Sequence, residues 1–208
     1  ATVDSYDSSR GAYGTTNNAE SASVSTNNTA SYSVRLNSHN RIEGDAYIGL
    51  GGSPTHGIYV NFFSFLTGQK RQAQAAAVMP SLSPPGGMPA SLGNVTYSSG
   101  TVIISTDLHF TDLTLTGNAT IRIQGDVRIH VNDDFRMYGN SRVLLDPGST
   151  LTLWLDDSAE IRNSAQLNPD SSATDRLTVY VYGNNERLYL RNSAVMAGSV
   201  YVDGDFRM

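Results

Sequence analysis

One nine-residue phrase recurs along this chain, and it strongly limits the folds that the chain can adopt. The phrase has two apolar residues in alternate positions, a central pair of small or amide residues, another small residue and a final apolar residue. Its copies are 34–42 (VRLNSHNRI), 113–121 (LTLTGNATI), 135–143 (FRMYGNSRV), 159–167 (AEIRNSAQL) and 188–196 (LYLRNSAVM). The last four copies start 22, 24 and 29 residues apart. Repeats of about 18 to 30 residues are typical of solenoid proteins.

The chemistry of the phrase indicates which kind of solenoid to expect. Apolar residues at every second position predict short strands with one buried face. Gly and Asn tolerate positive φ best, so the central pair predicts a sharp corner. The corner residues are Gly117, Asn118, Gly139, Asn140, Asn163 and Asn192. A second apolar strand follows each corner, as in 123–129 (IQGDVRI), and the apolar residues never adopt helical spacing.

Coils made of short strands without intervening helices stack their equivalent strands in parallel, about 4.8 Å apart. The sequence therefore predicts an all-β fold, a single-stranded parallel β-helix of about seven coils. We expect right-handed winding, because connections between parallel strands usually have that hand.

The β-helix is expected to span residues 31–208, with two irregular stretches. Residues 1–30 are rich in Ser, Thr and Asn and predict an irregular arm or cap. Residues 67–93 predict an excursion from the coils, with a short helix over 69–78 followed by a Pro-Gly loop. Phe206 and Met208 match the first two inward positions of a further coil. We expect that coil to be an open end, either cut at a boundary or completed by another chain.

Composition excludes several classes of function. The sequence has no cysteine, which excludes disulfides, thiolate catalysis and cysteine zinc sites. A net charge of −5 and the absence of a basic stripe argue against nucleic acid as a partner. No apolar run approaches the roughly 18 residues of a membrane span, and no pattern predicts a cofactor.

Carboxylates raise the question of catalysis, because many β-helices degrade polysaccharides. Asp133, Asp157 and Glu186 each lie two residues before a copy of the phrase, so they are predicted to stack in successive coils. Such a stack could share a proton or bind Ca²⁺. We favour the simpler interpretation that these residues occupy exposed turns, where Asp and Asn bond local backbone donors.

The remaining polar patterns give weaker signals. None of the four histidines, His39, His56, His109 and His130, has a partner at the spacing of a metal site. His39 occupies a corner position, which predicts a structural role. A threonine face for ice binding is disfavoured, because the three outward threonines of 113–120 are not repeated in the next coils.

A candidate contact surface follows from the predicted alignment of the coils. Thr114, Arg136, Glu160 and Tyr189 are predicted to share one external column. The residues most suited to bind a protein or polysaccharide are the arginines and tyrosines of this column and its neighbour, Arg136, Tyr138, Arg162, Tyr189 and Arg191.

A family resemblance covers nearly the whole chain. The opening 3–14 (VDSYDSSRGAYG), the stretch 88–101 (MPASLGNVTYSSGT) and the repeated corner together resemble a β-solenoid domain of unknown function. That domain occurs in bacterial envelope proteins with type IV pilin-like or pilus-assembly N-termini, and bactofilin-like and adhesin-like solenoids reuse similar coils. The resemblance carries no catalytic residues.

These observations together lead to an expected function. We expect a non-enzymatic, extracellular or cell-surface module with a structural or adhesive role, which assembles with other protein chains, such as pilus or filament components, or binds surface polysaccharide. The alternative is a carbohydrate-binding or carbohydrate-degrading β-helix that uses Asp133, Asp157 and Glu186.

Overall fold

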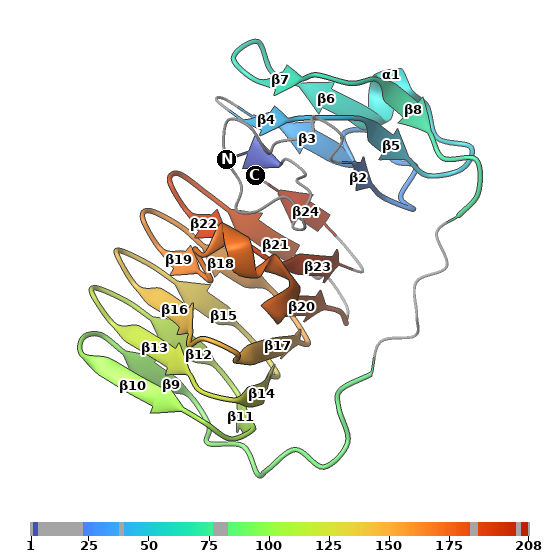
Figure 1. Cartoon of the computed structure of the whole chain (residues 1–208). Coiled ribbons are helices and arrows are strands. Elements are labelled where there is room, and N and C mark those ends of the chain that lie inside the picture. The colour runs from blue at the N-terminus through green and yellow to red at the C-terminus, as the bar shows by residue number, and fades with distance from the viewer. Residues whose placement is uncertain are drawn as a thin grey trace. The chain divides into compact units, whose positions relative to one another are not determined.

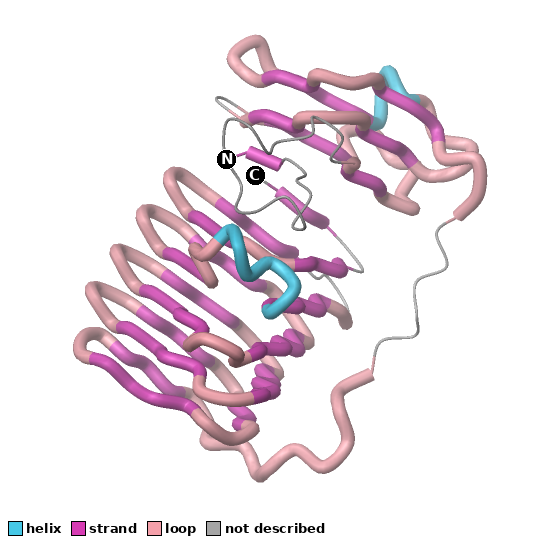
Figure 2. The backbone as a smooth tube through the Cα atoms, in the orientation of Figure 1, coloured by secondary structure: helices cyan, strands magenta, loops and turns pink. Residues whose placement is uncertain are grey.

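The structure is a computed structural model, and it describes residues 2–3, 23–37, 40–76, 83–183, 187–202 and 205–207. The chain folds as a parallel β-solenoid of about seven coils with very little helix (Figure 2). It divides into two compact units. The N-terminal unit comprises residues 1–80 with 207–208, and the C-terminal unit comprises residues 81–206.

The C-terminal unit is built of three parallel sheets, and each coil from β9 to β23 contributes one strand to each sheet, while β24 extends sheet 1 alone (Figure 1). Sheet 1 contains β9 (Val95–Tyr97), β12 (Leu113–Leu115), β15 (Phe135–Met137), β18 (Ala159–Ile161), β21 (Arg187–Leu190) and β24 (Asp205–Arg207). Sheet 2 contains β10 (Thr101–Ile104), β13 (Thr120–Ile123), β16 (Arg142–Leu145), β19 (Gln166–Leu167) and β22 (Val195–Met196). Sheet 3 contains β11 (Leu108–Phe110), β14 (Asp126–Val131), β17 (Thr150–Leu155), β20 (Leu177–Val181) and β23 (Ser199–Val202).

The strand register of sheet 1 confirms the repeat. Leu113 pairs with Phe135, Phe135 with Ala159, and Ala159 with Leu188, so the first residues of the four phrases form one inward column. The inward residues of all three sheets form one buried apolar core. The insertion that makes the last interval longer includes two short 3₁₀ turns within Ser171–Arg176, which are separated by a kink at Ala173.

The corners form where the sequence predicts them. In the four later copies, positive φ falls on the first residue of the central pair, at Gly117, Gly139, Asn163 and Asn192. Asn118 and Asn140 occupy the second position, and their side-chain amides join adjacent coils at 3.3 Å. The small residue that follows is fully buried at Ala119, Ser141 and Ala165, because it points into the crowded interior of the corner, and the equivalent Ala194 is partly buried.

The N-terminal unit contains the same kind of coil. Its sheets are β1 (Thr2–Val3), β4 (Arg41–Ile42) and β7 (Phe65–Leu66); β2 (Val24–Ser25), β5 (Ala46–Ile48) and β8 (Lys70–Gln72); and β3 (Val34–Leu36) with β6 (Ile58–Val60). A one-turn helix, α1 (Pro54–Gly57), precedes β6. A separate apolar cluster of six buried residues forms its core.

The irregular stretches depart in part from the expectation. The predicted helix over 69–78 is wrong at its start, because Lys70–Gln72 is a strand that pairs with Ala46–Ile48. Thr2–Val3 and Val24–Ser25 of the predicted arm also pair as strands. Between β8 and β9, the described residues 73–76 and 83–94 form no strand. Phe206 lies in β24, while Met208 lies outside the described residues.

Candidate functional site: outward faces of the C-terminal unit

The outward face of sheet 1 carries the predicted contact surface. Thr114, Arg136, Glu160 and Tyr189 pair in register and form one external column, as the sequence predicts. A second column begins where the strands end. There, backbone hydrogen bonds join Tyr138 N to Leu115 O at 2.8 Å, Arg162 N to Met137 O at 3.0 Å and Arg191 N to Ile161 O at 2.9 Å. The two columns place arginine and tyrosine side chains on adjacent coils.

Glu160 connects this surface. The Tyr138 hydroxyl donates to Glu160 Oε2 at 3.0 Å, and Glu160 Oε1 lies 3.9 Å from Nη1 of both Arg162 and Arg191. The guanidinium of Arg162 covers the Tyr138 ring at 3.9 Å from its centroid, and that of Arg191 covers the Tyr189 ring at 4.4 Å. Burial and the hydrogen bond to Glu160 raise the pKa of Tyr138, so its hydroxyl keeps its proton. We call these five residues (Tyr138, Glu160, Arg162, Tyr189 and Arg191) the Arg–Tyr cluster.

Arg136, the fifth residue of the predicted surface, lies in the same column but has a different partner. Its guanidinium pairs with Asp134, two residues earlier in the chain. Burial raises the pKa of the Asp134 carboxyl, Arg136 opposes the rise, and the nearby carboxylates of Asp157, Asp112 and Asp133 add to it. Arg136 therefore forms its ion pair with Asp134, beside several other carboxylates, and is not part of the Arg–Tyr cluster.

Of the predicted carboxylate stack, Asp133 and Asp157 are among the described residues. Val131 pairs with Leu155 and Phe135 pairs with Ala159 in adjacent coils. Three residues lie between the paired positions in each coil. Asp133 and Asp157 consequently occupy equivalent corner positions in adjacent coils. Glu186 lies outside the described residues. Within the described part of the chain, no group of three or more His, Asp or Glu side chains is arranged to hold a metal ion.

Sheet 3 carries an outward feature that the nine-residue phrase does not predict. Strand pairing aligns five rings in one column, His109, His130, Trp154, Tyr180 and Tyr201. His109 stacks on His130 at 4.6 Å between centroids, Trp154 on Tyr180 at 4.3 Å, and Tyr180 on Tyr201 at 5.2 Å. The sequence contains the signal, since a ring lies between two apolar residues in LHF, IHV, LWL, VYV and VYV. We call these five residues the ring column.

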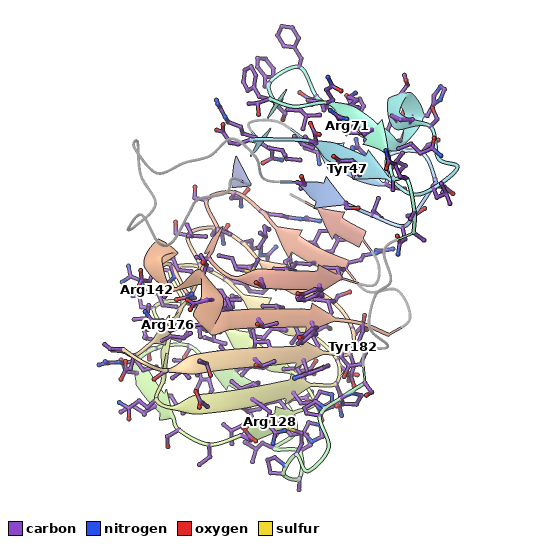
Figure 3. All side chains as sticks on the ribbon, turned by 45° about the vertical axis from the view of Figure 1, so that its right-hand side comes forward. Tyr47, Arg71, Arg128, Arg142, Arg176 and Tyr182 are labelled. Carbon is purple, nitrogen blue, oxygen red and sulfur yellow. The ribbon has the colours of Figure 1, made fainter. Side chains whose placement is uncertain are left out.

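Polar side chains border the ring column where the strands of sheet 3 end. His109 Nε2 lies 2.9 Å from Asn132 Oδ1, and His130 Nε2 lies 2.8 Å from Asp156 Oδ1. Tyr182 packs edge-on against Trp154. Burial raises the pKa of Tyr182, and the neighbouring Asp156 carboxylate raises it further. Figure 3 shows the outward side chains of this sheet, with Arg128 and Tyr182 labelled.

Two donors in this region are buried without a partner. Neither Trp154 Nε1 nor the Tyr182 hydroxyl reaches a hydrogen-bond acceptor among the described residues. Asp156 lies close enough to Tyr182 to affect its pKa, but the two side chains do not meet at hydrogen-bonding geometry. Of the other histidines, His56 lies in α1 and its Nδ1 is 3.1 Å from the hydroxyl of Ser53, which precedes the helix, and His39 lies outside the described residues.

The fold and these faces define the chain as a parallel β-solenoid with two ordered outward surfaces. No family model, curated protein or solved structure matches it. In the described residues, no helix has the length and apolar character needed to cross a membrane.

Proposed function

We propose that the chain is a non-enzymatic structural and adhesive module of the extracellular space or cell surface. It contacts other protein chains, including components of a pilus or filament, through the Arg–Tyr cluster. The observation that carries this proposal is the connected arrangement of Tyr138, Arg162 and Arg191 around Glu160. The resemblance of the sequence to solenoids of bacterial envelope proteins supports the location.

The geometry suits recognition because the side chains support one another before any partner arrives. Arginine and tyrosine are the residues most enriched at energetic hot spots of protein interfaces. Each arginine of the cluster lies over a tyrosine ring, so less side-chain freedom is lost on binding. Adjacent coils of a β-solenoid fix the spacing of the two columns, which gives the surface a rigid base.

The test combines light scattering after size-exclusion chromatography with a glycan array. Concentration-dependent assembly without glycan binding supports a scaffold, and glycan binding without turnover supports adhesion. Glu160→Gln removes the central charge and is expected to weaken either interaction, whereas Thr178→Ala on sheet 3 is the matched control. A chain that stays monomeric and binds no glycan, or one that hydrolyses the glycans, contradicts the proposal.

Carbohydrate binding through the ring column is the second candidate. Aromatic surfaces bordered by a few fixed polar groups are typical of small-ligand sites, and Asn132 and Asp156 supply such groups beside the rings. On the array, this candidate predicts that Asp156→Asn lowers glycan binding while Glu160→Gln does not. Release of reducing sugar that depends on Asp133 and Asp157 would instead support the degradation alternative.

A further inference from the structure

Tyr180 and Tyr201 lie face to face at the end of the ring column. They are Cα partners on the neighbouring strands β20 and β23 (Figure 1). Their ring centroids are 5.2 Å apart and the ring planes differ by only 19°. Because the two strands are parallel and in register, both side chains leave the sheet on the same side. The two phenol rings therefore face each other across roughly one strand spacing.

The two rings differ in their surroundings. Tyr180 lies between Trp154, whose ring centroid is 4.3 Å away, and Tyr201, so both faces of its ring are covered. Tyr201 lies on β23, the last strand of sheet 3, and its exposed fraction is 40%. One ring is thus held in place by its neighbours, while the other is accessible to a reagent in solution.

A second close pair of tyrosines, in the N-terminal unit, lacks this stacked geometry. The ring centroids of Tyr32 and Tyr59 are 5.4 Å apart, but the ring planes stand at 89°. Tyr32 is 57% exposed, so it is at least as accessible as Tyr201. In an edge-to-face pair, the hydrogens of one ring point at the face of the other. The two pairs are therefore alike in distance and accessibility and differ in the orientation of the rings.

We propose that Tyr180 and Tyr201 form an oxidative modification site, at which a one-electron oxidant joins the two rings as an intramolecular dityrosine. The class of oxidant is a haem peroxidase supplied with hydrogen peroxide. This inference goes beyond the proposed function, since it assigns covalent chemistry to two residues of sheet 3 and does not depend on the Arg–Tyr cluster.

The reaction consumes one hydrogen peroxide for each cross-link. Each phenol loses one electron and its hydroxyl proton and becomes a phenoxyl radical, whose unpaired electron is shared with the ring carbons beside the oxygen, the ortho carbons. A C–C bond then forms between an ortho carbon of Tyr180 and one of Tyr201. The hydrogen on each of these carbons moves as a proton to the phenolic oxygen, and both rings become aromatic again. The two electrons and two protons removed reduce the peroxide to two molecules of water.

The fold supplies the proximity that this coupling requires. Two radicals must meet before either is quenched, and groups held side by side react as if they were present at a very high concentration. The product would join β23 covalently to β20. The sequence has no cysteine, so a disulfide cannot provide such a link. Like a disulfide, the cross-link closes a loop and restrains the unfolded chain.

Oxidation of the full chain with hydrogen peroxide and a haem peroxidase tests the proposal. Trypsin releases Tyr180 in the peptide 177–187 and Tyr201 in the peptide 192–207. The expected product in mass spectrometry is these two peptides joined with the loss of two hydrogen atoms. The fluorescence of dityrosine measures the yield, which should not change when the protein is diluted, because the coupling occurs within one chain.

Substitutions identify the residues that couple. Tyr180→Phe and Tyr201→Phe should each lower the yield of dityrosine about tenfold or more, because each removes one phenol of the stacked pair. Tyr182→Phe is the matched control, since Tyr182 lies in the same tryptic peptide as Tyr180 and should leave the yield unchanged. Tyr32→Phe removes the perpendicular pair and should also leave it unchanged. Far-UV circular dichroism verifies the fold of each variant.

Several outcomes would overturn the proposal. The peptides 177–187 and 192–207 could remain unlinked after oxidation of the folded chain, or Tyr182→Phe could remove the link. A link between Tyr32 and Tyr59 of equal yield would show that stacking does not select the site. A yield that rises with protein concentration would show that Tyr201 couples between separate copies instead.

Discussion

At the residue scale, the corner glycines show how a single Cβ decides the shape of a coil. Gly117 has φ of +58°, and a Cβ there would come within 2.5 Å of Ser98 O on the preceding coil. The equivalent corners at Asn163 and Asn192 also have positive φ. The sequence predicts these corners because Gly and Asn are the residues that tolerate such φ values. The sequence does not predict how closely the backbones of adjacent coils approach at Gly117, because that distance depends on which residue of the preceding coil lies against it.

Gly117→Ala is therefore expected to destabilise the chain more than Gly148→Ala does. Both positions have positive φ, which costs alanine about 1–2 kcal/mol. A Cβ at Gly148 meets no atom within 4 Å, so that substitution pays for backbone strain alone. At Gly117 the backbone must also move away from Ser98, and the total is expected to reach about 3 kcal/mol. Equal losses in chemical denaturation would contradict the role of the close contact.

The ion pair between Asp107 and Arg128 predicts a dependence of stability on pH. Hydrogen bonds from Arg128 hold the pKa of Asp107 below its ordinary value of 3.8, although burial opposes them. A lowered pKa stabilises the fold above the ordinary value, and the contribution disappears as the pH falls through the folded-state pKa. Asp107→Asn should thus lose stability relative to the parent near pH 6, and the difference should shrink below about pH 3. Denaturation series at several pH values measure this.

Asp134 provides a control, because its pKa is shifted in the opposite direction to that of Asp107. Its pKa is raised, chiefly by burial, so its ionisation in the folded state opposes stability as the pH rises through that pKa. Asp134→Asn should become more stable relative to the parent between about pH 3 and pH 7, whereas Asp107→Asn becomes less stable. If both variants show the same trend, the assigned environments are incorrect.

Among the elements, the nine-residue phrase predicts the strand register of sheet 1, but it does not predict the outward rings of sheet 3. The phrase marks the first residue of each coil, so its copies specify which residues stack, including Arg136, Glu160 and Tyr189. The ring column lies on the strands of sheet 3, which the phrase does not cover. Predicting it from the sequence would require aligning those strands across all the coils. The glutamines and alanines that follow Lys70 favour helix locally, but Lys70–Gln72 forms a strand because pairing with β5 overrides that preference.

Buried and outward-facing side chains alternate along β17, so substitutions on its two faces should differ in their effect on stability. Leu153 is buried in the core, while Thr152 in the same strand faces outward and is half-buried. Leu153→Ala should cost about 2–5 kcal/mol, because it removes core contacts and leaves a cavity. Thr152→Ala should change the free energy of unfolding by no more than about 1 kcal/mol. Urea denaturation measures the loss in free energy of unfolding for both variants. Similar losses would contradict the assignment of one face of β17 to the core and the other to solvent.

The whole molecule divides into two compact units. The phrase at 34–42 has the same frame as the later copies, so the sequence alone does not mark this division. Among the described residues, each unit has its own apolar cluster. The described core of the C-terminal unit has 24 buried residues and that of the N-terminal unit has six. Hydrophobic stabilisation grows with the apolar area buried, so the two units should differ strongly in stability.

This difference predicts that denaturation occurs in two steps. Trp154 is the only tryptophan and lies in β17, so its fluorescence reports on the C-terminal unit alone. Far-UV circular dichroism reports on the strands of both units and should begin to change at a lower urea concentration than the fluorescence. Leu153→Ala should shift the fluorescence transition and leave the early dichroism step in place, while Ile42→Ala should do the reverse, since Ile42 is buried in the N-terminal core. Coincident transitions in the parent chain and in both variants would show that the two units unfold as one cooperative structure.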